Sequence, residues 1–220
     1  MPDQLISLLA GFVGVLAGGA ITFWIQWYFT RRAEKAARRV QVIKIQHCIR
    51  QAANDVAVWN KQLREDIPSK HKGELWPYVQ GYIGFNDQPI IVGAEDLSVF
   101  SAPKTAEFAN EILLLVEIRN AVANAILHYN DVRKSLTESL TPLATEISEE
   151  NFIMTGVDLR AHPEIAAQKG QCESLVKSIF ELLEDGKRVS KSIGGAFGEN
   201  TKAVLGKKSQ LGLAFACDEN

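Results

Sequence analysis

The sequence predicts an all-α protein, in which a single N-terminal transmembrane helix continues into a cytoplasmic, antiparallel bundle of three long helices. Three observations predict this fold. Residues 5–29 carry no charged side chain, a cluster of arginines follows that run directly, and three later segments place apolar residues at alternating steps of three and four. Such steps are the period of helices that pack along a narrow seam, as in a coiled coil.

The N-terminal run is long enough to cross a bilayer. At about 1.5 Å per residue, a helix over residues 5–29 covers the roughly 30 Å hydrocarbon core. A cleaved secretory signal would begin with basic residues and carry a shorter apolar stretch, whereas this chain begins MPDQ. Residues 1–30 are therefore interpreted as an uncleaved anchor.

The charges beside this run predict its orientation. Basic residues flank membrane helices on the cytoplasmic side, so the short N-terminus is expected outside and the bulk of the chain inside, at a bacterial inner membrane. Trp24, Trp27 and Tyr28 would mark the inner boundary, where aromatic rings prefer to lie. Five residues are expected to contact lipid headgroups: Arg31, Arg32, Lys35, Arg38 and Arg39.

Small residues recur on one face of the predicted anchor, and they include a GxxxG pair. Small side chains allow two helices to approach closely in lipid, where packing replaces the hydrophobic effect. This face predicts a homo-oligomer, and its members are Ser7, Gly11, Gly14, Gly18 and Thr22.

The remaining chain divides into four parts. Residues 31–66 form a basic juxtamembrane segment and the first bundle helix, and since residues 31–66 contain no Pro or Gly, one helix is expected to run from the membrane to about Asp66. Residues 103–206 hold the second helix, from about Lys104 to Leu140, and the third, from Pro163 until it weakens near GGAFG. Their connection, 141–162, predicts a short helix plus a turn, and residues 207–220 a C-terminal tail.

The connection over residues 67–102 is rich in aromatic residues, prolines and glycines, and predicts an irregular insertion. Two interpretations remain open. Its side chains either cap the end of the bundle or form a partner or ligand surface, because aromatic loops on rigid scaffolds often bind ligands. The residues concerned are Trp76, Tyr78, Tyr82 and Phe85.

Motifs for chemistry are missing from the sequence. There is no Glu-x-x-His pair, no HExxH, no paired CxxC and no GxSxG. The segment GGAFGENTKAVLGKKS lacks the spacing of a phosphate-binding loop. Three distant cysteines suit a reducing compartment. We therefore expect no enzyme, cofactor or metal. The net charge of −2, although residues 31–39 carry +4, leaves an acidic body that argues against nucleic acid.

These observations together favour a single-pass, membrane-anchored helical interaction module that contacts lipid, self-associates and binds a protein partner at the inner face of the membrane. The alternative is a membrane-tethered sensor, or a stress or defence effector, with a ligand site in the aromatic connection. The sequence does not specify the biological role further.

Overall fold

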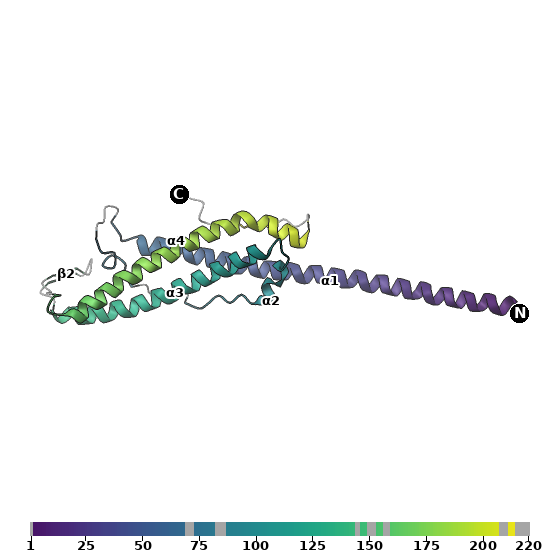
Figure 1. Ribbon diagram of the computed structural model, residues 1–220, viewed down its shortest axis with the longest axis horizontal. Helices are drawn as coiled ribbons and strands as arrows, with labels where there is room; N and C mark the ends of the chain where they lie inside the picture. Colours follow the sequence, from purple (N-terminus) through teal and green to yellow (C-terminus); the bar gives the residue numbers. More distant parts are fainter. Residues whose placement is uncertain are drawn as a thin grey trace.

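The computed structural model describes residues 2–68, 73–81, 87–143, 146–148, 153–155, 159–206 and 211–213. It describes the side chains of all these residues except residues 2–13 and the two short strands. The protein is helical throughout its main body (Figure 1). Its long helices are α1 (Pro2–Arg64), α3 (Ala106–Leu140) and α4 (Pro163–Leu205). A single turn, α2 (Ala94–Leu97), and two 3-10 turns, η1 (Ser98–Phe100) and η2 (Thr141–Leu143), lie between them.

The long helices begin close to where the sequence places them, and α1 and α3 also end there. α1 is continuous over 63 residues, and α3 starts two residues after the expected Lys104. Pro163 occupies the first turn of α4, where its missing N–H costs nothing and its fixed φ suits a helix. Glu164 in the same turn complements the positive end of the helix dipole.

The three long helices do not alternate in direction, so the expected antiparallel arrangement is wrong for the first pair. α1 and α3 run parallel, and only α4 runs antiparallel to both (Figure 1). Val42 of α1 lies in the same apolar cluster as Phe108, near the start of α3. Leu63, near the end of α1, lies in a second cluster with residues further along α3, such as Val122. The physical reason is the connection over residues 65–105, which is long enough to run back along the bundle before α3 begins.

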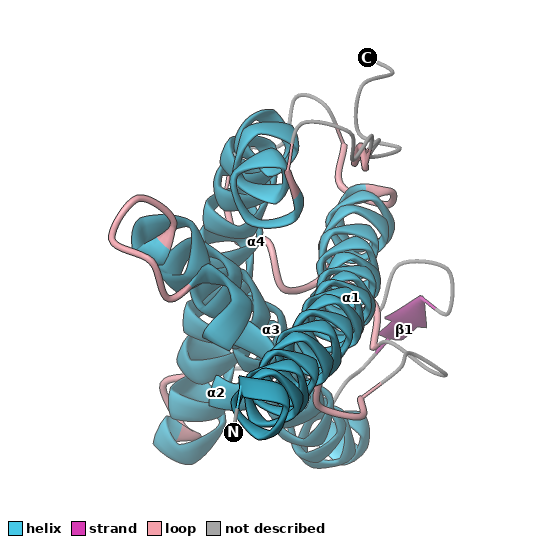
Figure 2. Ribbon diagram, turned by 90° about the vertical axis from the view of Figure 1, so that its right-hand side faces the viewer, coloured by secondary structure: helices cyan, strands magenta, loops and turns pink. Residues whose placement is uncertain are grey.

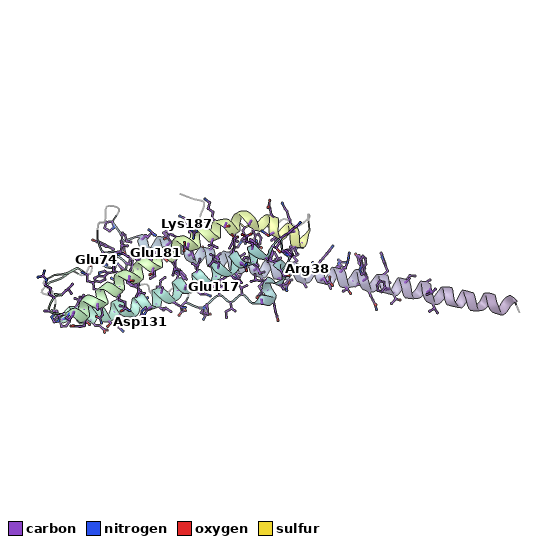
Figure 3. All side chains as sticks on the ribbon, viewed as in Figure 1. Arg38, Glu74, Glu117, Asp131, Glu181 and Lys187 are labelled. Carbon is purple, nitrogen blue, oxygen red and sulfur yellow. The ribbon has the colours of Figure 1, made fainter. Side chains whose placement is uncertain are left out.

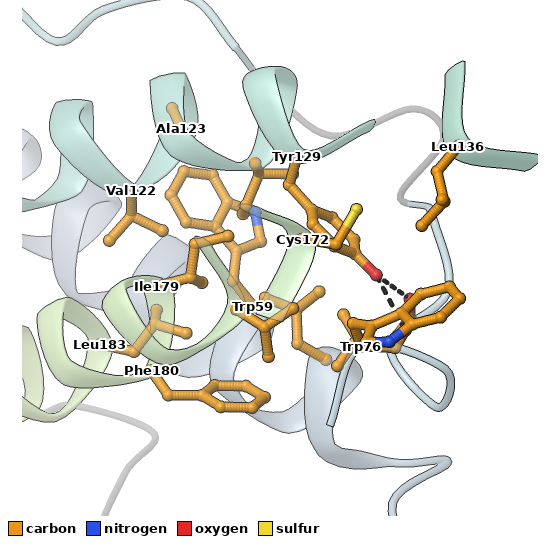
Figure 4. Packing of buried hydrophobic residues seen from close by; sticks show 14 of the residues in the cluster. Trp59, Trp76, Val122, Ala123, Tyr129, Leu136, Cys172, Ile179, Phe180 and Leu183 are labelled. Atoms are coloured by element: carbon orange, nitrogen blue, oxygen red, sulfur yellow. Dashed lines mark hydrogen bonds between the residues drawn. The ribbon is translucent and has the colours of Figure 1, made fainter. Parts of the chain in front are cut away.

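The core consists of two apolar clusters along the bundle. The proximal cluster lies next to the free part of α1 and includes Val42, Ile45, Ile49, Phe100, Phe108, Ile112, Ile193 and Phe197. The distal cluster lies at the opposite end and includes Val56, Trp59, Trp76, Val122, Tyr129, Cys172, Ile179 and Leu183 (Figure 4). All three long helices contribute to each cluster. Figure 2, viewed from the N-terminal end of α1, shows the ribbons of α1, α3 and α4 grouped together.

The helices approach closely at Gly186 of α4. A Cβ atom at this position would lie 3.1 Å from Val56 Cγ1 and 3.2 Å from Ile118 Cγ2. Contacts this short are rare for real Cβ atoms, so only glycine fits without movement of its neighbours. Gly186 therefore permits α4 to lie against α1 and α3 at the level where the two clusters meet.

α4 does not weaken at GGAFG, contrary to the expectation from its glycines. It continues to Leu205, because Ile193 and Phe197 are fully buried in the proximal cluster. The Phe197 ring meets the Phe108 ring edge-on, with 6.2 Å between their centroids. This packing outweighs the low helix propensity of glycine, which costs about 1 kcal/mol per residue relative to alanine.

The connection between α3 and α4 contains a short helical turn, η2, as predicted, but also a strand pair that was not predicted. After η2, strand β1 (Glu146–Ser148) pairs antiparallel with β2 (Ile153–Thr155), with Ile147 opposite Met154. Each strand has three residues, fewer than the alternating run of about 4–8 residues by which a strand is recognised in a sequence, so this pairing was not predicted.

One described helix has the length and composition needed to cross a membrane. It is α3 together with the turn η2 that continues it (Ala106–Leu143). About half of its most apolar stretch is buried inside the bundle, and Arg119 and Arg133 are buried along it. The core helix of a soluble protein can have the same length and composition, and α3 contributes residues to both clusters. We therefore interpret α3 as the core helix of the bundle.

Candidate membrane and partner surface

The first part of α1 projects beyond the bundle as a free rod (Figure 1). Every residue from Gly14 to Val40 is exposed. Large apolar side chains cover this rod, and the exposed fractions reach 75% for Val15 and 70% for Phe23. Soluble proteins rarely leave a continuous apolar surface of this extent uncovered.

Aromatic rings and an arginine mark the end of the apolar rod. The rings of Trp24 and Tyr28 stack with centroids 6.2 Å apart, and Phe29 meets Tyr28 edge-on at 5.9 Å. The guanidinium of Arg31 lies 4.3 Å from the centroid of the Trp27 ring. Such a cation–π contact places a charge directly beside the last aromatic turn.

The predicted lipid-contact residues follow this boundary and form a basic collar. Its members are all exposed on helix α1, and Figure 3 shows the labelled Arg38 on the rod next to the bundle. The collar lies between the apolar part of the rod and Val42, the first residue of α1 in the proximal cluster. It consists of Arg31, Arg32, Lys35, Arg38 and Arg39.

The predicted small-residue face lies on the same rod. A Cβ atom at Gly14 or Gly18 would meet nothing within 4 Å, so these glycines are not required by packing within one chain. The hydroxyl of Thr22 donates to the carbonyl of Gly18 at 2.8 Å, which satisfies this side chain within its own helix. The structure describes neither the side chain of Ser7 nor the surroundings of Gly11.

The first part of the aromatic connection, around Trp76 and Val79, is fixed at the distal end of the bundle. Trp76 is only 8% exposed and Val79 is buried, both in the distal cluster. Tyr129 Oη lies 3.0 Å from the Trp76 carbonyl oxygen and 2.6 Å from that of Val79, so its one proton can be donated to either (Figure 4). Arg133 Nη1 also donates to the Val79 carbonyl, at 2.6 Å.

A carboxylate from α4 holds the other side of this segment. Glu173 Oε2 accepts hydrogen bonds from the backbone N–H groups of Leu75, at 2.7 Å, and Trp76, at 3.2 Å. Glu173 also pairs with Lys177, at 3.2 Å. Tyr78 is half-buried, and Tyr82 and Phe85 lie outside the described residues. Trp76 therefore belongs to a packed cap, which favours that interpretation over a ligand surface built on its ring.

Acidification is expected to loosen this cap through Glu173. Burial raises the pKa of its carboxyl, but the hydrogen bonds from Trp76, Leu75 and Lys177 outweigh burial and leave the pKa below its usual 4.5. A depressed folded pKa stabilises the protein above the unfolded pKa, and this contribution is lost as pH falls through the folded value. Glu173→Gln should therefore lower the free energy of unfolding near pH 7, and the difference from wild type should shrink below about pH 4.5.

Urea unfolding at several pH values, followed by the fluorescence of the buried tryptophans, measures this effect. Glu181→Gln is the matched control, because Glu181 is exposed on the same helix. A difference between wild type and Glu173→Gln that does not change with pH would contradict the proposed role of the Glu173 charge.

Sequence reasoning missed a buried ion pair in the bundle. Arg119 of α3 is fully buried, and its Nε and Nη2 each lie 2.8 Å from Asp55 Oδ2 of α1. Its Nη1 donates to the Gln88 carbonyl at 2.7 Å, and its guanidinium lies 5.0 Å from the Trp59 ring centroid. The signal in the sequence was an arginine inside the most apolar run of α3, where an unpaired charge is not tolerated.

The neighbouring Asn120 fixes the returning connection to α3. Its Oδ1 accepts from the Ile90 N–H at 3.1 Å, and its Nδ2 donates to the Ile90 carbonyl at 2.9 Å. This two-way pairing imitates a strand partner and satisfies both backbone groups of Ile90. Arg119 and Asn120 together hold the connection along the bundle.

The described residues offer no group of three or more His, Cys, Asp or Glu side chains that could hold a metal ion. Burial raises the pKa of the Cys48 and Cys172 thiols, which keeps both in the less nucleophilic protonated form at neutral pH.

Comparisons with protein-family models, curated proteins and solved structures found no match for this chain.

Proposed function

We propose that this protein is a single-pass, membrane-anchored helical interaction module, whose bundle stands on the cytoplasmic face of a membrane. The observation that carries this proposal is the uncovered apolar rod of α1, which ends in an aromatic turn and a basic collar. In this arrangement the rod lies in lipid and the collar contacts anionic headgroups. The chain self-associates through its anchor, and the bundle presents its surface to a protein partner.

The size of the uncovered surface favours lipid as its environment. Nine large side chains of the rod are exposed: Val15, Leu16, Ile21, Phe23, Trp24, Ile25, Trp27, Tyr28 and Phe29. Burying one such side chain stabilises by about 1.5–3 kcal/mol, so transfer of the rod into a bilayer is worth on the order of 10 kcal/mol. Between Val15 and Phe29 the rod carries no charged side chain on any side, as expected for a helix surrounded by lipid.

The collar supports one direction of insertion. Arginines and lysines remain on the cytoplasmic side of a membrane helix, and each is worth about 1 kcal/mol near an anionic leaflet. In the proposed orientation the bundle, which follows the collar in the chain, lies in the cytoplasm, and the N-terminus lies outside. A bacterial inner membrane fits this arrangement.

Labelling in intact cells tests the proposal. Native cysteines are first replaced by serine or alanine, and a cysteine is then introduced at Pro2 or, as control, at Lys187, which is exposed on α4. A membrane-impermeant maleimide should label Pro2→Cys in intact cells and Lys187→Cys only after permeabilisation. The reverse pattern would contradict the orientation, and release of the chain from membranes by alkaline carbonate would contradict the anchor.

A further inference from the structure

The collar residues are not spread evenly around α1. At about 100° per residue, all five fall within an arc of about 120° on the helix surface. This arc overlaps the side of α1 that, from Val42 onward, packs against α3 and α4. The positive charges of the rod therefore point toward the side occupied by the bundle.

A separate arc of the rod, about 80° wide, carries no charge over its whole length. Outside the apolar rod it contains Ala33, Ala36 and Val40, with Ile43 at its edge. Ala33 and Ala36 are exposed, Val40 is 67% exposed and Ile43 is 47% exposed. Two branched apolar side chains thus face solvent beyond the collar, where a bilayer would not reach.

This uncharged arc continues the small-residue face of the predicted anchor. Its residues repeat every 11 positions, a period that keeps a face aligned along a nearly straight helix. We call the aligned set the α1 seam; it consists of Gly18, Thr22 and Ile25, then Phe29, Ala33 and Ala36, then Val40. The seam crosses the aromatic and basic boundary without interruption.

The bundle leaves the end of the seam open. On one side of α1, Gln41 Nε2 donates to the Glu95 carbonyl at 3.3 Å and Lys44 pairs with Asp96 at 2.7 Å, which holds α2. On another side, Gln46 Nε2 donates to the Gly212 carbonyl at 2.9 Å. Val40 and Ile43 lie between these two attachments and remain exposed.

We propose that a second copy of this chain covers the α1 seam, in a parallel dimer whose two bundles lie on the outside. The proposal rests on the proposed membrane anchor and extends the contact beyond the membrane, from Gly18 to Val40. Lipid covers only the apolar part of the seam, so the occupant is a helix that is apolar inside the membrane and continues past its surface. α1 itself has this property.

Charge favours the same arrangement. Two copies inserted in the same direction present the same seam at the same depth, as two-fold symmetric pairing requires. With the seams together, the collars turn away from the contact and like charges do not face each other. The alanines at positions 33 and 36 allow the two backbones to approach closely, as glycine does within the membrane.

Disulfide crosslinking in membranes tests the dimer. Single cysteines replace Ala36 or Val40 on the seam, and Lys35 or Arg38 on the collar as controls, in the full chain with Cys48 and Cys217 changed to serine. The fully buried Cys172 is retained. Ala36→Cys and Val40→Cys should form dimers on mild oxidation at least roughly tenfold more than the two collar variants.

The outcomes separate the anchor from the dimer. The proposed second copy is overturned, while the anchor stands, if the protein stays in the membrane on alkaline carbonate treatment and one of three results is found. These results are equal crosslinking on the seam and the collar, no crosslinking on either, or a seam product that contains a different protein. A chain released by carbonate contradicts the anchor. Two differently tagged copies recovered in one product identify a homodimer.

A substitution in the apolar rod provides an independent measurement. Gly18→Ile adds a branched side chain on the seam and should reduce the Val40→Cys crosslink roughly tenfold. Gly19→Ile is the matched control, because Gly19 is also open but lies about 100° away. Equal crosslinking in both variants would overturn the continuous seam.

Discussion

Replacing Arg119 by alanine is expected to lower the free energy of unfolding by about 3 kcal/mol or more, the range found when one partner of a buried ion pair is removed. The substitution leaves Asp55 without its cation and releases the Gln88 carbonyl. It also removes the charge beside the Trp59 ring. Asp55 keeps some contact with solvent, its side chain being 16% exposed, which places the expected loss at the lower end of that range.

Urea unfolding of the full chain in mild detergent, followed by tryptophan fluorescence, measures this loss. Arg188→Ala is the matched control, since Arg188 pairs with Asp185 on the surface and its removal should cost less than about 0.5 kcal/mol. Adding Asp55→Ala to Arg119→Ala should recover part of the loss, because the uncompensated carboxylate is then gone. Equal losses for Arg119→Ala and Arg188→Ala would contradict the importance of the buried pair.

Replacing Gly186 by leucine is expected to cost about 3 kcal/mol, the upper end of the usual cost of overpacking, because a Cβ alone already lies within 3.1 Å of Val56 and 3.2 Å of Ile118. α4 would have to move away from both other helices. Gly195→Leu on the same helix should have little effect or stabilise slightly, since a Cβ there meets nothing within 4 Å and leucine has the higher helix propensity.

Thermal unfolding of the two variants in the same detergent compares them. Gly186→Ala adds a single methyl group, and its cost should be reduced when Val56 is also changed to alanine, which removes the nearest methyls. Similar melting temperatures for Gly186→Leu and Gly195→Leu would show that the helices do not pack closely at this level.

The sequence predicts the helices well because their apolar period is a local property. It does not predict that α1 and α3 run parallel, since the same stripes can be buried in either direction. The direction depends on contacts between distant residues, such as Arg119 with Asp55 and Asn120 with Ile90. A charge within an apolar stripe indicates a buried partner but does not identify it.

The candidate site divides in the same way. The apolar rod and its basic collar can be predicted from the sequence, because they depend on the residue types within one continuous segment and not on contacts with distant residues. The cap around Trp76 does not, because the hydrogen bonds from Leu75 and Trp76 to Glu173 join residues nearly 100 positions apart. GGAFG suggests a weak helix locally, whereas the distant Phe108 stabilises it through Phe197.

The order of the helices along the chain sets the time at which the core can form during synthesis. α1 is complete at Arg64, yet the helices that cover its apolar stripe are complete only at Leu140 and Leu205. At about 5–20 residues per second, the ribosome needs roughly 7–28 s to pass from the end of α1 to the end of α4. During this interval the nascent chain exposes Ile45, Ile49 and Trp59 to chaperones and to other unfinished chains.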